Sequence, residues 1–384
     1  MKTKRLLMLV GSVCLAVMLA LPLVASCGPA APEEGAEAEL EAKLAAEKAK
    51  VSSLEDEVAD LEDEIAGLRA PGEVYEWRLA DEYGAAMTSW CLDPLVADIS
   101  DMSGGLIEIE LYASGVLVPD DQALDALDKN IIDMARTASA YFADKMDTAM
   151  LNCLPFIWQD AVECEILLHK LGLEDIIREG YADLGAYYLC ESMSGPYYML
   201  TNTPVTCIAD LQPLKIRATA TNTPWLAELG VSSTYYPAAE LYTSLSTGIV
   251  DGAIYGGATD YTDLGLFEVA TYIIKPTVYN PACDLYLVSL DLWNSLPKNL
   301  QTILTAAGRK SSRFIYDEFQ RREIVDLAAA KETYGVTVTI LPAEDQALIF
   351  QAADKQWDEQ AARSERTARG IEIIRSWHEV LRGS

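Results

Sequence analysis

The segment that decides the fold spans residues 210–217 (DLQPLKIR), 237–242 (PAAELY) and 244–252 (SLSTGIVDG). Its apolar and β-branched residues predict short strands at 214–219 and 249–255, and the stretch between them predicts helix. Strands that alternate with helices are typical of a mainly parallel sheet that is flanked by helices. The segment therefore indicates an α/β fold.

The same alternation extends along the chain in both directions. The other expected strands are 74–80, 106–112, 131–136, 197–202, 283–290 and 336–341, and the expected helices are 87–102, 120–129, 160–171, 224–229, 238–247, 298–334 and 343–382. We expect a body at residues 73–384 with two α/β lobes and long C-terminal helices. Lobe 1 would hold about 73–196 plus part of the C-terminal region, and lobe 2 about 197–290.

The composition excludes several classes of function. The chain has 384 residues, with 29 Lys+Arg against 59 Asp+Glu and a formal net charge of −30. Phosphate binding needs clustered basic side chains, so nucleic acid is not an expected partner. Histidine occurs only at His169 and His378, and Gly-x-Ser-x-Gly, Walker and His-Glu-x-x-His motifs are absent. We therefore expect no catalytic residues, no cofactor and no metal site.

The N-terminus has the features of an export signal. Basic residues within 2–5 precede an apolar run at 6–25, and small residues then lead to a cysteine in the sequence VASC at 24–27. This segment resembles a bacterial lipoprotein signal, which implies that residues 1–26 are cleaved and that the thiol of Cys27 is lipidated. A run of about 20 apolar residues can also span a bilayer, so the alternative is an uncleaved membrane anchor. Both alternatives place the remaining chain outside the cytoplasm.

Residues 27–72 are expected to form a stalk. Between 33 and 69, apolar residues recur at the a and d positions of a coiled coil, with one polar core position at Glu47. About 30 helical residues would make a rod of roughly 45 Å, which Pro71 and Gly72 end. The stalk would either self-associate, as a dimer or trimer, or serve as a single solvated helical spacer.

The cysteines of the body leave two possibilities open. They are Cys91, Cys153, Cys164, Cys190, Cys207 and Cys283, and none has Cys-x-x-Cys or zinc spacing. An even number outside the cytoplasm permits disulfides. Buried free thiols are the alternative, because a domain of this size does not need cross-links.

Motifs upstream of the opening segment complete a specific pattern. Residues 123–127 (ALDAL) lead to 132–138 (IDMARTA) and then to 154–156 (LPF). In this order and spacing, together with residues 210–252, they resemble the extracytoplasmic solute-binding subunit of tripartite ATP-independent periplasmic (TRAP) transporters, the DctP-type family. The resemblance is nearest to the branch that binds 2-oxo acids and lactate. Further counterparts in that branch are 77–80, 137–139, 250–257 and 264–265.

The resemblance implies a two-lobed, periplasmic-binding-protein-like fold with a hinge, and a ligand in the cleft between the lobes. It also implies that the arginine at the end of the LKIR motif binds the carboxylate of the ligand, which carries over to Arg217. A guanidinium group matches a carboxylate bidentately and stays charged when it is buried. The alternative is that Arg217 forms an internal ion pair with one of the many acidic residues.

Three positions depart from the family pattern. The second arginine of many members falls on Tyr197, and the successive glutamate and tryptophan of the 2-oxo-acid branch fall on Ile254 and Tyr255. Isoleucine cannot ligate a metal, so neither a bound cation nor a plain 2-oxo acid is expected. Tyr255 can stack on a ligand or hydrogen-bond to it.

Aromatic residues are expected to line much of the cleft, which would suit a partly apolar organic acid. The candidates are Tyr141, Phe142, Trp158, Tyr197, Tyr198 and Tyr255, with Ser139 and Asn222 as possible hydrogen-bonding partners of the ligand.

The sequence therefore predicts a lipid-anchored protein that captures a small organic carboxylate. It would hand this ligand to a separate TRAP-type membrane permease, and binding would shift an equilibrium between open and closed lobes. Two alternatives use the same fold: a ligand sensor that acts through a signalling partner, and a structural surface lipoprotein whose cleft is empty. An enzyme is not expected.

Overall fold

The computed structural model describes residues 43, 45–51, 53–54 and 74–383. The chain divides into two compact units, Met1–Gly72 and Glu73–Ser384. The described residues of the first unit are helical, and Lys50 forms an ion pair with Glu47 there at 2.7 Å. The signal segment, Cys27 and most of the expected coiled coil lie outside the described residues. Within the described part of the chain, the helices are too short or too polar to cross a membrane.

The first lobe is built on a five-stranded sheet with the strand order β2-β1-β3-β10-β4. In β1, Trp77, Leu79 and Asp81 are buried and the residues between them are not, as the period of a strand requires. The strands are β1 (Tyr75–Asp81), β2 (Ile107–Tyr112), β3 (Met134–Thr137), β4 (Ala186–Met193) and β10 (Cys283–Ser289). The α-helices are α3 (Ala85–Ser103), α4 (Ala123–Asp128), α5 (Ala161–His169), α6 (Leu173–Ala182) and α11 (Leu290–Ser295), and the 3₁₀ helices are η2 (Asp120–Gln122), η3 (Ser139–Phe142) and η4 (Asp147–Asn152).

The second lobe is built on a six-stranded sheet with the strand order β11-β9-β5-β8-β6-β7. Its strands are β5 (Tyr197–Thr201), β6 (Lys215–Arg217), β7 (Ser232–Thr234), β8 (Gly252–Ile254), β9 (Tyr272–Tyr279) and β11 (Thr337–Ile340). Its α-helices are α7 (Ile208–Leu211), α8 (Thr223–Glu228), α9 (Leu241–Ser246) and α10 (Ala258–Asp263), and its 3₁₀ helices are η5 (Ala238–Glu240) and η6 (Leu266–Glu268). Residues 210–217 thus contain β6, residues 237–252 contain α9 and the start of β8, and β6 and β8 are parallel neighbours.

Both sheets are mixed, which corrects the expectation of a mainly parallel sheet. In the first sheet, β10 is antiparallel to β3 and to β4, and in the second, β5 is antiparallel to β8 and to β9. The lobe boundary expected at residue 290 is also wrong for Cys283–Ser289. These residues form β10, whose hydrogen bonds lie in the sheet of the first lobe.

Two extended segments cross between the lobes side by side. Residues 194–196 join β4 to β5, and residues 280–282 join β9 to β10. The amide of Ser194 donates to the carbonyl of Ala282 at 2.8 Å, and the amide of Ala282 donates to the carbonyl of Gly195 at 3.0 Å. The two crossings are therefore tied to each other where the lobes meet.

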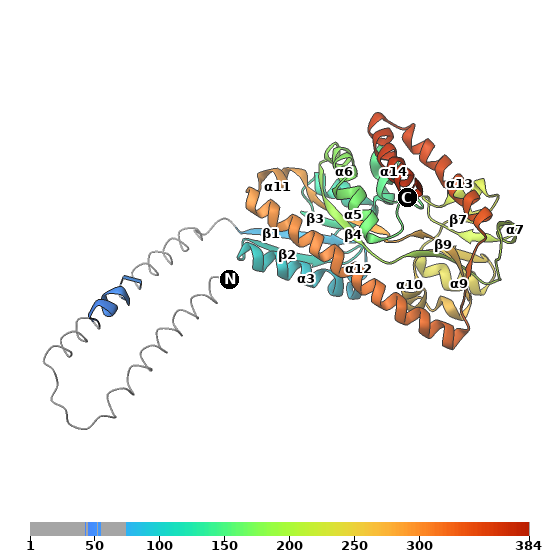
Figure 1. Ribbon diagram of the computed structural model, residues 1–384, viewed down its shortest axis with the longest axis horizontal. Coiled ribbons are helices and arrows are strands. Elements are labelled where there is room, and N and C mark those ends of the chain that lie inside the picture. The colour runs from blue at the N-terminus through green and yellow to red at the C-terminus, as the bar shows by residue number, and fades with distance from the viewer. Residues whose placement is uncertain (1–42, 44, 52, 55–73, 384) are drawn as a thin grey trace, which may run out of the picture. The chain divides into compact units, whose positions relative to one another are not determined.

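The C-terminal helices connect the lobes a second time. The helix α12 (Lys298–Tyr334) has the bounds expected from the sequence and packs on β4 and α3 in the first lobe and on α10 in the second (Figure 1). The chain then adds β11 to the second sheet, and α13 (Ala343–Ala361) packs on α8. The next helix, α14 (Glu365–Gly383), returns to α5 and α6 of the first lobe.

The single helix expected at 343–382 is interrupted. The side chain of Ser364 accepts a hydrogen bond from the amide of Thr367 at 3.2 Å, as a helix N-cap does, so α14 begins as a new helix after α13.

The six cysteines of the body are free thiols. The sulfur atoms of Cys164 and Cys283 are 3.6 Å apart and both residues are buried.

Candidate ligand-binding cleft

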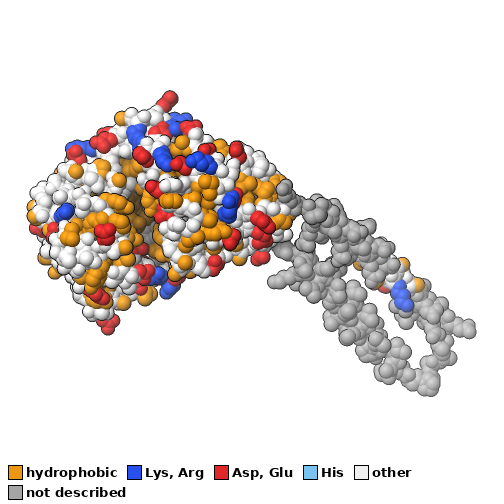
Figure 2. Space-filling view, turned by 180° about the vertical axis from the view of Figure 1, so that it is seen from behind, with side chains coloured by type: hydrophobic (Ala, Val, Ile, Leu, Met, Phe, Trp, Pro, Cys, Tyr) orange, Lys and Arg blue, Asp and Glu red, His pale blue; other side chains and the backbone are white. Residues whose placement is uncertain are grey.

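A cavity of about 670 Å³ lies between the two lobes, where the space-filling view shows the body hollowed (Figure 2). Cavities of roughly 300–1,000 Å³ are typical of small-molecule sites. The first lobe and the β9–β10 crossing contribute Glu82, Tyr83, Asp120, Asp121, Ala138, Ser139, Ala140, Tyr141, Asn152, Cys153, Ala282, Cys283 and Asp284. The second lobe contributes Tyr197, Arg217, Thr219, Thr221, Tyr235, Pro237, Ala238, Tyr255 and Tyr279.

Many lining side chains lie at the carboxyl ends of parallel strands. Glu82 follows β1, Ser139 follows β3, Thr219 follows β6 and Tyr255 follows β8. Ligands of open α/β sheets bind beyond this end of the strands. The topology therefore turns residues that are far apart in the sequence toward one cavity.

Arg217, the last residue of β6, is 3% exposed and reaches this cavity. Its Nε and Nη2 donate to the carbonyl of Tyr236 at 3.1 and 2.9 Å, and Nη1 donates to the carbonyl of Ile254 at 3.3 Å. One N–H on each terminal nitrogen is left without an acceptor among the described residues. No ion pair to Arg217 is present within that part of the chain, so the internal ion pair considered as an alternative is not formed there.

Aromatic rings surround the guanidinium group. Its Cζ lies 5.1 Å from the ring centre of Tyr235 and 5.4 Å from that of Tyr255. Burial raises the pKa of Tyr255 to about 12 even though the charge of Arg217 opposes the shift, so its hydroxyl stays protonated and can donate. Tyr197 also lines the cavity and packs edge-on against Tyr279 at 5.5 Å.

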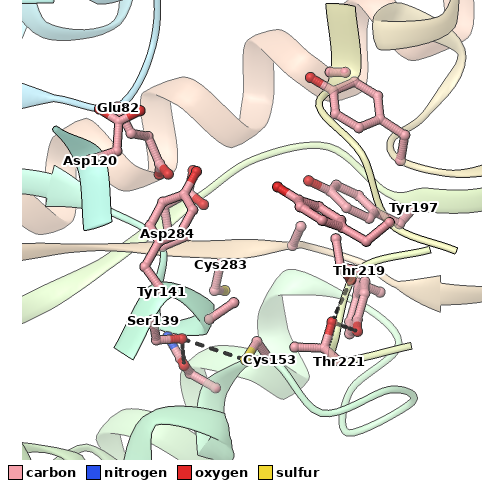
Figure 3. A pocket seen from close by; sticks show the side chains of 18 of the residues that line it. Glu82, Asp120, Ser139, Tyr141, Cys153, Tyr197, Thr219, Thr221, Cys283 and Asp284 are labelled. Atoms are coloured by element: carbon pink, nitrogen blue, oxygen red, sulfur yellow. Dashed lines mark hydrogen bonds between the residues drawn. The ribbon is translucent and has the colours of Figure 1, made fainter. Parts of the chain in front are cut away.

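A group of acidic side chains lies on the side of the cavity formed by the first lobe, with Tyr197 and Thr219 on the other side (Figure 3). Glu82 follows β1, Asp120 begins η2, and Asp284 lies near the start of β10. Burial, together with the charge of Asp81, raises the pKa of Asp284 to about 6, and burial together with the neighbouring carboxylates raises the pKa of Glu82 well above its usual value. The hydroxyl of Tyr83 donates to Asp284 at 2.8 Å. These acids are not among the residues predicted to line the site, although the position of Glu82 directly after a strand is a usable signal.

A comparison with protein families identifies the chain. The model of the DctP family, described as "Bacterial extracellular solute-binding protein, family 7", matches residues 90–364. The chain belongs to the DctP family. Members of this family are solute-binding proteins of TRAP transporters and not enzymes, which confirms the family predicted from the sequence.

Curated relatives of this DctP-family protein carry descriptions of acid binding. It is 28% identical, over 63% of its own length and 68% of the relative, to a monocarboxylate 2-oxoacid-binding periplasmic protein from Nostoc sp.. It is 25% identical, over 68% of its own length and 78% of the relative, to the C4-dicarboxylate-binding periplasmic protein DctP of Rhodobacter capsulatus.

Solved structures share the fold. A TRAP periplasmic solute-binding protein from Colwellia psychrerythraea with bound calcium and pyruvate matches with a TM-score of 0.71 and 23% identity, over 81% of this chain and 96% of that one. Another from Chromohalobacter salexigens with bound (S)-(+)-2-amino-1-propanol matches with a TM-score of 0.70 and 23% identity, over 81% and 97%. The two-lobed α/β fold is thereby confirmed.

This DctP-family protein lacks the glutamate that helps to hold a cation in the 2-oxo-acid branch. Ile254 replaces that glutamate, and its side chain is fully buried in the apolar core of the second lobe. Within the described residues, no group of three His, Cys, Asp or Glu side chains is placed to hold a metal ion. The residues at this position therefore do not fit a cation.

The structure brings most of the predicted site residues to the cavity. Arg217, Tyr255, Tyr197, Tyr141 and Ser139 all line it.

Among these, Ser139 is held by the first lobe itself. Its hydroxyl donates to the side-chain oxygen of Asn152 at 2.6 Å, so one of its bonds is already made.

Three aromatic candidates and one amide are placed elsewhere, which corrects the prediction for Trp158. This residue is 1% exposed, its indole nitrogen donates to the carbonyl of Pro281 at 2.8 Å, and it does not line the cavity. The indole is held in the core because its polar atom finds a backbone acceptor there. Phe142 and Tyr198 are buried outside the lining as well. Asn222 does not line the cavity. Its side-chain oxygen accepts a hydrogen bond at 3.0 Å from the hydroxyl of Tyr279, which does line it.

Proposed function

We propose that this protein captures a small organic carboxylate in the cleft between its lobes and delivers it to a TRAP-type membrane permease. The observation that carries the proposal is the environment of Arg217, a buried cation whose hydrogen bonds go to neutral carbonyl groups. An uncompensated buried charge is unfavourable, and a carboxylate that reaches the two unused N–H groups would compensate it.

The lobes would close over the ligand by bending at the paired crossings, residues 194–196 and 280–282. Few residues connect the two sheets there, and a few residues suffice to absorb a hinge rotation. Arg217 and Tyr255 come from the second lobe, whereas Tyr141 and Ser139 come from the first. A ligand that contacts both sides would favour the closed state because it binds that state better.

The relatives support the chemical class of the ligand. The Nostoc relative is described as binding monocarboxylate 2-oxoacids and the Rhodobacter relative as binding C4-dicarboxylates. Because Ile254 replaces the glutamate of the 2-oxo-acid branch, we propose an organic acid that is bound without a metal ion. The matches to solute-binding proteins lend no support to the alternative of a sensor.

We also propose that the protein acts at a membrane surface outside the cytoplasm. The family is extracellular, and the lipoprotein-like sequence at 24–27 would provide an anchor at Cys27. The stalk at 27–72 would hold the body away from the membrane. Mass spectrometry of the mature N-terminus tests the anchor, since a diacylglycerol on Cys27 is expected and an unmodified residue 1 would contradict it.

A thermal-shift screen against organic acids tests the proposed capture. A true ligand at 100 times its Kd should add about 2.7 kcal/mol to the free energy of unfolding. Mass spectrometry of the small molecules that co-purify with the chain would name the natural ligand. If no carboxylate stabilises the protein and none co-purifies, the cleft does not serve acid capture.

A further inference from the structure

The charges that line the cleft do not suit a simple anion. Arg217 is the one basic residue among the lining residues that the structure describes, and four carboxyl groups line the cavity with it: Glu82, Asp120, Asp121 and Asp284. An anion would gain the attraction of Arg217 but would meet an excess of negative charge on the opposite side. The ligand therefore needs a positive group that faces the acids.

Among the described residues, no Lys or Arg side chain forms an ion pair with Glu82 or Asp284. The nearest guanidinium group, that of Arg136, donates from Nε and Nη2 to the two oxygens of Asp81 at 2.7 and 2.8 Å, and is thus already occupied. Oε1 of Glu82 is buried and receives no hydrogen bond from a described donor. The Glu82 and Asp284 carboxyl groups interact directly with each other.

We propose that the cleft binds an amino-carboxylate zwitterion, whose acid group pairs with Arg217 and whose protonated amine is held by Glu82 and Asp284. This inference rests on the proposed function for the Arg217 side and adds the recognition of the amine on the other. An ammonium group brings three N–H donors, one of which can go to the free Oε1 of Glu82 and the others to the remaining carboxyl oxygens of the pair. The tyrosine rings at the cavity, Tyr141 and Tyr255 among them, offer further favourable contacts to a cation.

An organic cation fits these acids better than a metal ion. Within the described residues, no three carboxylate, thiol or imidazole groups converge as metal ligands would. Two close carboxyl groups with a free oxygen provide hydrogen-bond acceptors for an ammonium group. A divalent metal ion would need additional oxygen ligands besides these two groups.

The proposal predicts how affinity depends on pH. Several charged and titratable groups surround Glu82 and Asp284, and Arg136 is the one cation among them: Asp81, Tyr83, Cys91, Asp120, Arg136, Tyr141, Tyr197, Tyr255 and Cys283. Burial, with the charge of Asp81 adding to it, raises the pKa of Asp284 to about 6, so the carboxyl pair gains charge as pH rises through that value. Affinity for an amino acid should rise from pH 5 to pH 8, whereas affinity for the corresponding plain acid should fall.

The test compares acids that differ only by an amino group. Isothermal titration calorimetry of the full chain would use leucine against 4-methylpentanoate, phenylalanine against 3-phenylpropanoate, and 5-aminopentanoate against pentanoate. We expect an amino acid to bind at least about tenfold more tightly than its plain partner, since a buried charge pair contributes this much or more. Glu82→Gln and Asp284→Asn should abolish the preference, and Arg217→Met should weaken both members of the pair.

A matched control is Asp144→Asn, which removes the same charge from an exposed position of the first lobe that does not line the cavity and should leave the preference intact. If either amide variant fails to fold, the pH dependence of the wild-type protein and the proton released on binding, measured in two buffers, give independent results.

The outcomes separate this inference from the proposed function. Tighter binding of the plain acids, or a preference for amino acids that survives both amide variants, overturns the inference but leaves acid capture by Arg217 in place. Binding of calcium chloride that depends on Asp284, with no preference for amines, assigns the acids to a metal and also overturns it. If no member of the series binds but another carboxylate without an amine does, the inference alone fails; if no carboxylate binds at all, both the inference and the proposed function fail.

Discussion

Arg136 donates two hydrogen bonds to Asp81 across adjacent parallel strands, and both side chains are buried. The hydroxyl of Thr88, in the first turns of α3, also donates to Asp81 at 2.6 Å, and the ring of Tyr83 lies 4.6 Å from the guanidinium carbon of Arg136. This ion pair thus joins β1, β3 and α3 directly behind the acidic side of the cleft.

Loss of Asp81 should therefore destabilise the body strongly. In Asp81→Ala, Arg136 would be left as an unpaired buried charge, which should lower the free energy of unfolding by about 3–5 kcal/mol. Urea denaturation followed by circular dichroism measures the change. The control is Glu179→Ala, which breaks the exposed ion pair to Arg369 (2.6 Å) and should change stability by about 0–1 kcal/mol. Equal losses in the two variants would show that the buried pair is not important for stability.

A second buried network should make stability depend on pH. Burial alone would lower the pKa of His169, but hydrogen bonds to Glu174 at 3.0 Å and Glu191 at 3.3 Å outweigh it and raise the pKa to about 9. Arg178 and Arg309 contact the same Glu174. The folded protein therefore holds a proton on His169 that the unfolded chain releases near pH 6.5.

The sign follows from this raised pKa. The stabilisation from His169 is fully present below pH 6.5 and is lost as pH rises through 9, with a total on the order of 3 kcal/mol at about 1.4 kcal/mol per pKa unit. Urea titrations from pH 6 to 10 should show a fall in the stability of the wild type that His169→Gln lacks. Parallel curves for the two proteins would contradict the assignment.

Thiol reactivity should follow burial. Burial raises the pKa of Cys153 to about 12 and raises the pKa values of Cys164 and Cys190, so little thiolate forms at pH 8. Cys207, which is partly exposed in the second lobe, should react first with iodoacetamide under native conditions. Peptide mass spectrometry measures this order, with urea-denatured protein as the fully labelled control. Labelling of Cys153 as fast as Cys207 would be inconsistent with this environment.

The sequence predicted the elements whose signals are local. The helix α12 was placed at its actual bounds because its periodic apolar residues run from Pro297 to Gly335, and these two residues mark its ends. The strands β4 and β9 were missed, although both are long. They lead into the crossings between the lobes, and most of β4 is buried without alternation, so the period that marks a half-exposed strand is absent.

The lining of the cavity could be predicted in part, with Tyr141 and Ser139 on the first lobe and Tyr197, Arg217 and Tyr255 on the second, but without the acidic residues. Arg217 could be found from the LKIR motif, and Tyr255 from the segment that follows it. Glu82 and Asp284 are 202 positions apart in the numbering and meet only because β10 returns from the second lobe into the first sheet. Strand pairing between distant segments is not encoded in local periodicity, so neither the mixed sheets nor the acidic side of the cleft could be derived from it.

The measurement that tests the central claim most directly is the affinity of Arg217→Met for the acid that the wild-type protein binds. Methionine keeps an apolar stem and removes the charge and both free N–H groups. Calorimetry should show a loss of about 2–5 kcal/mol in binding free energy, while Arg369→Met, at an exposed position, should bind like the wild type. A folded Arg217→Met variant that binds the acid with an unchanged Kd would contradict the account.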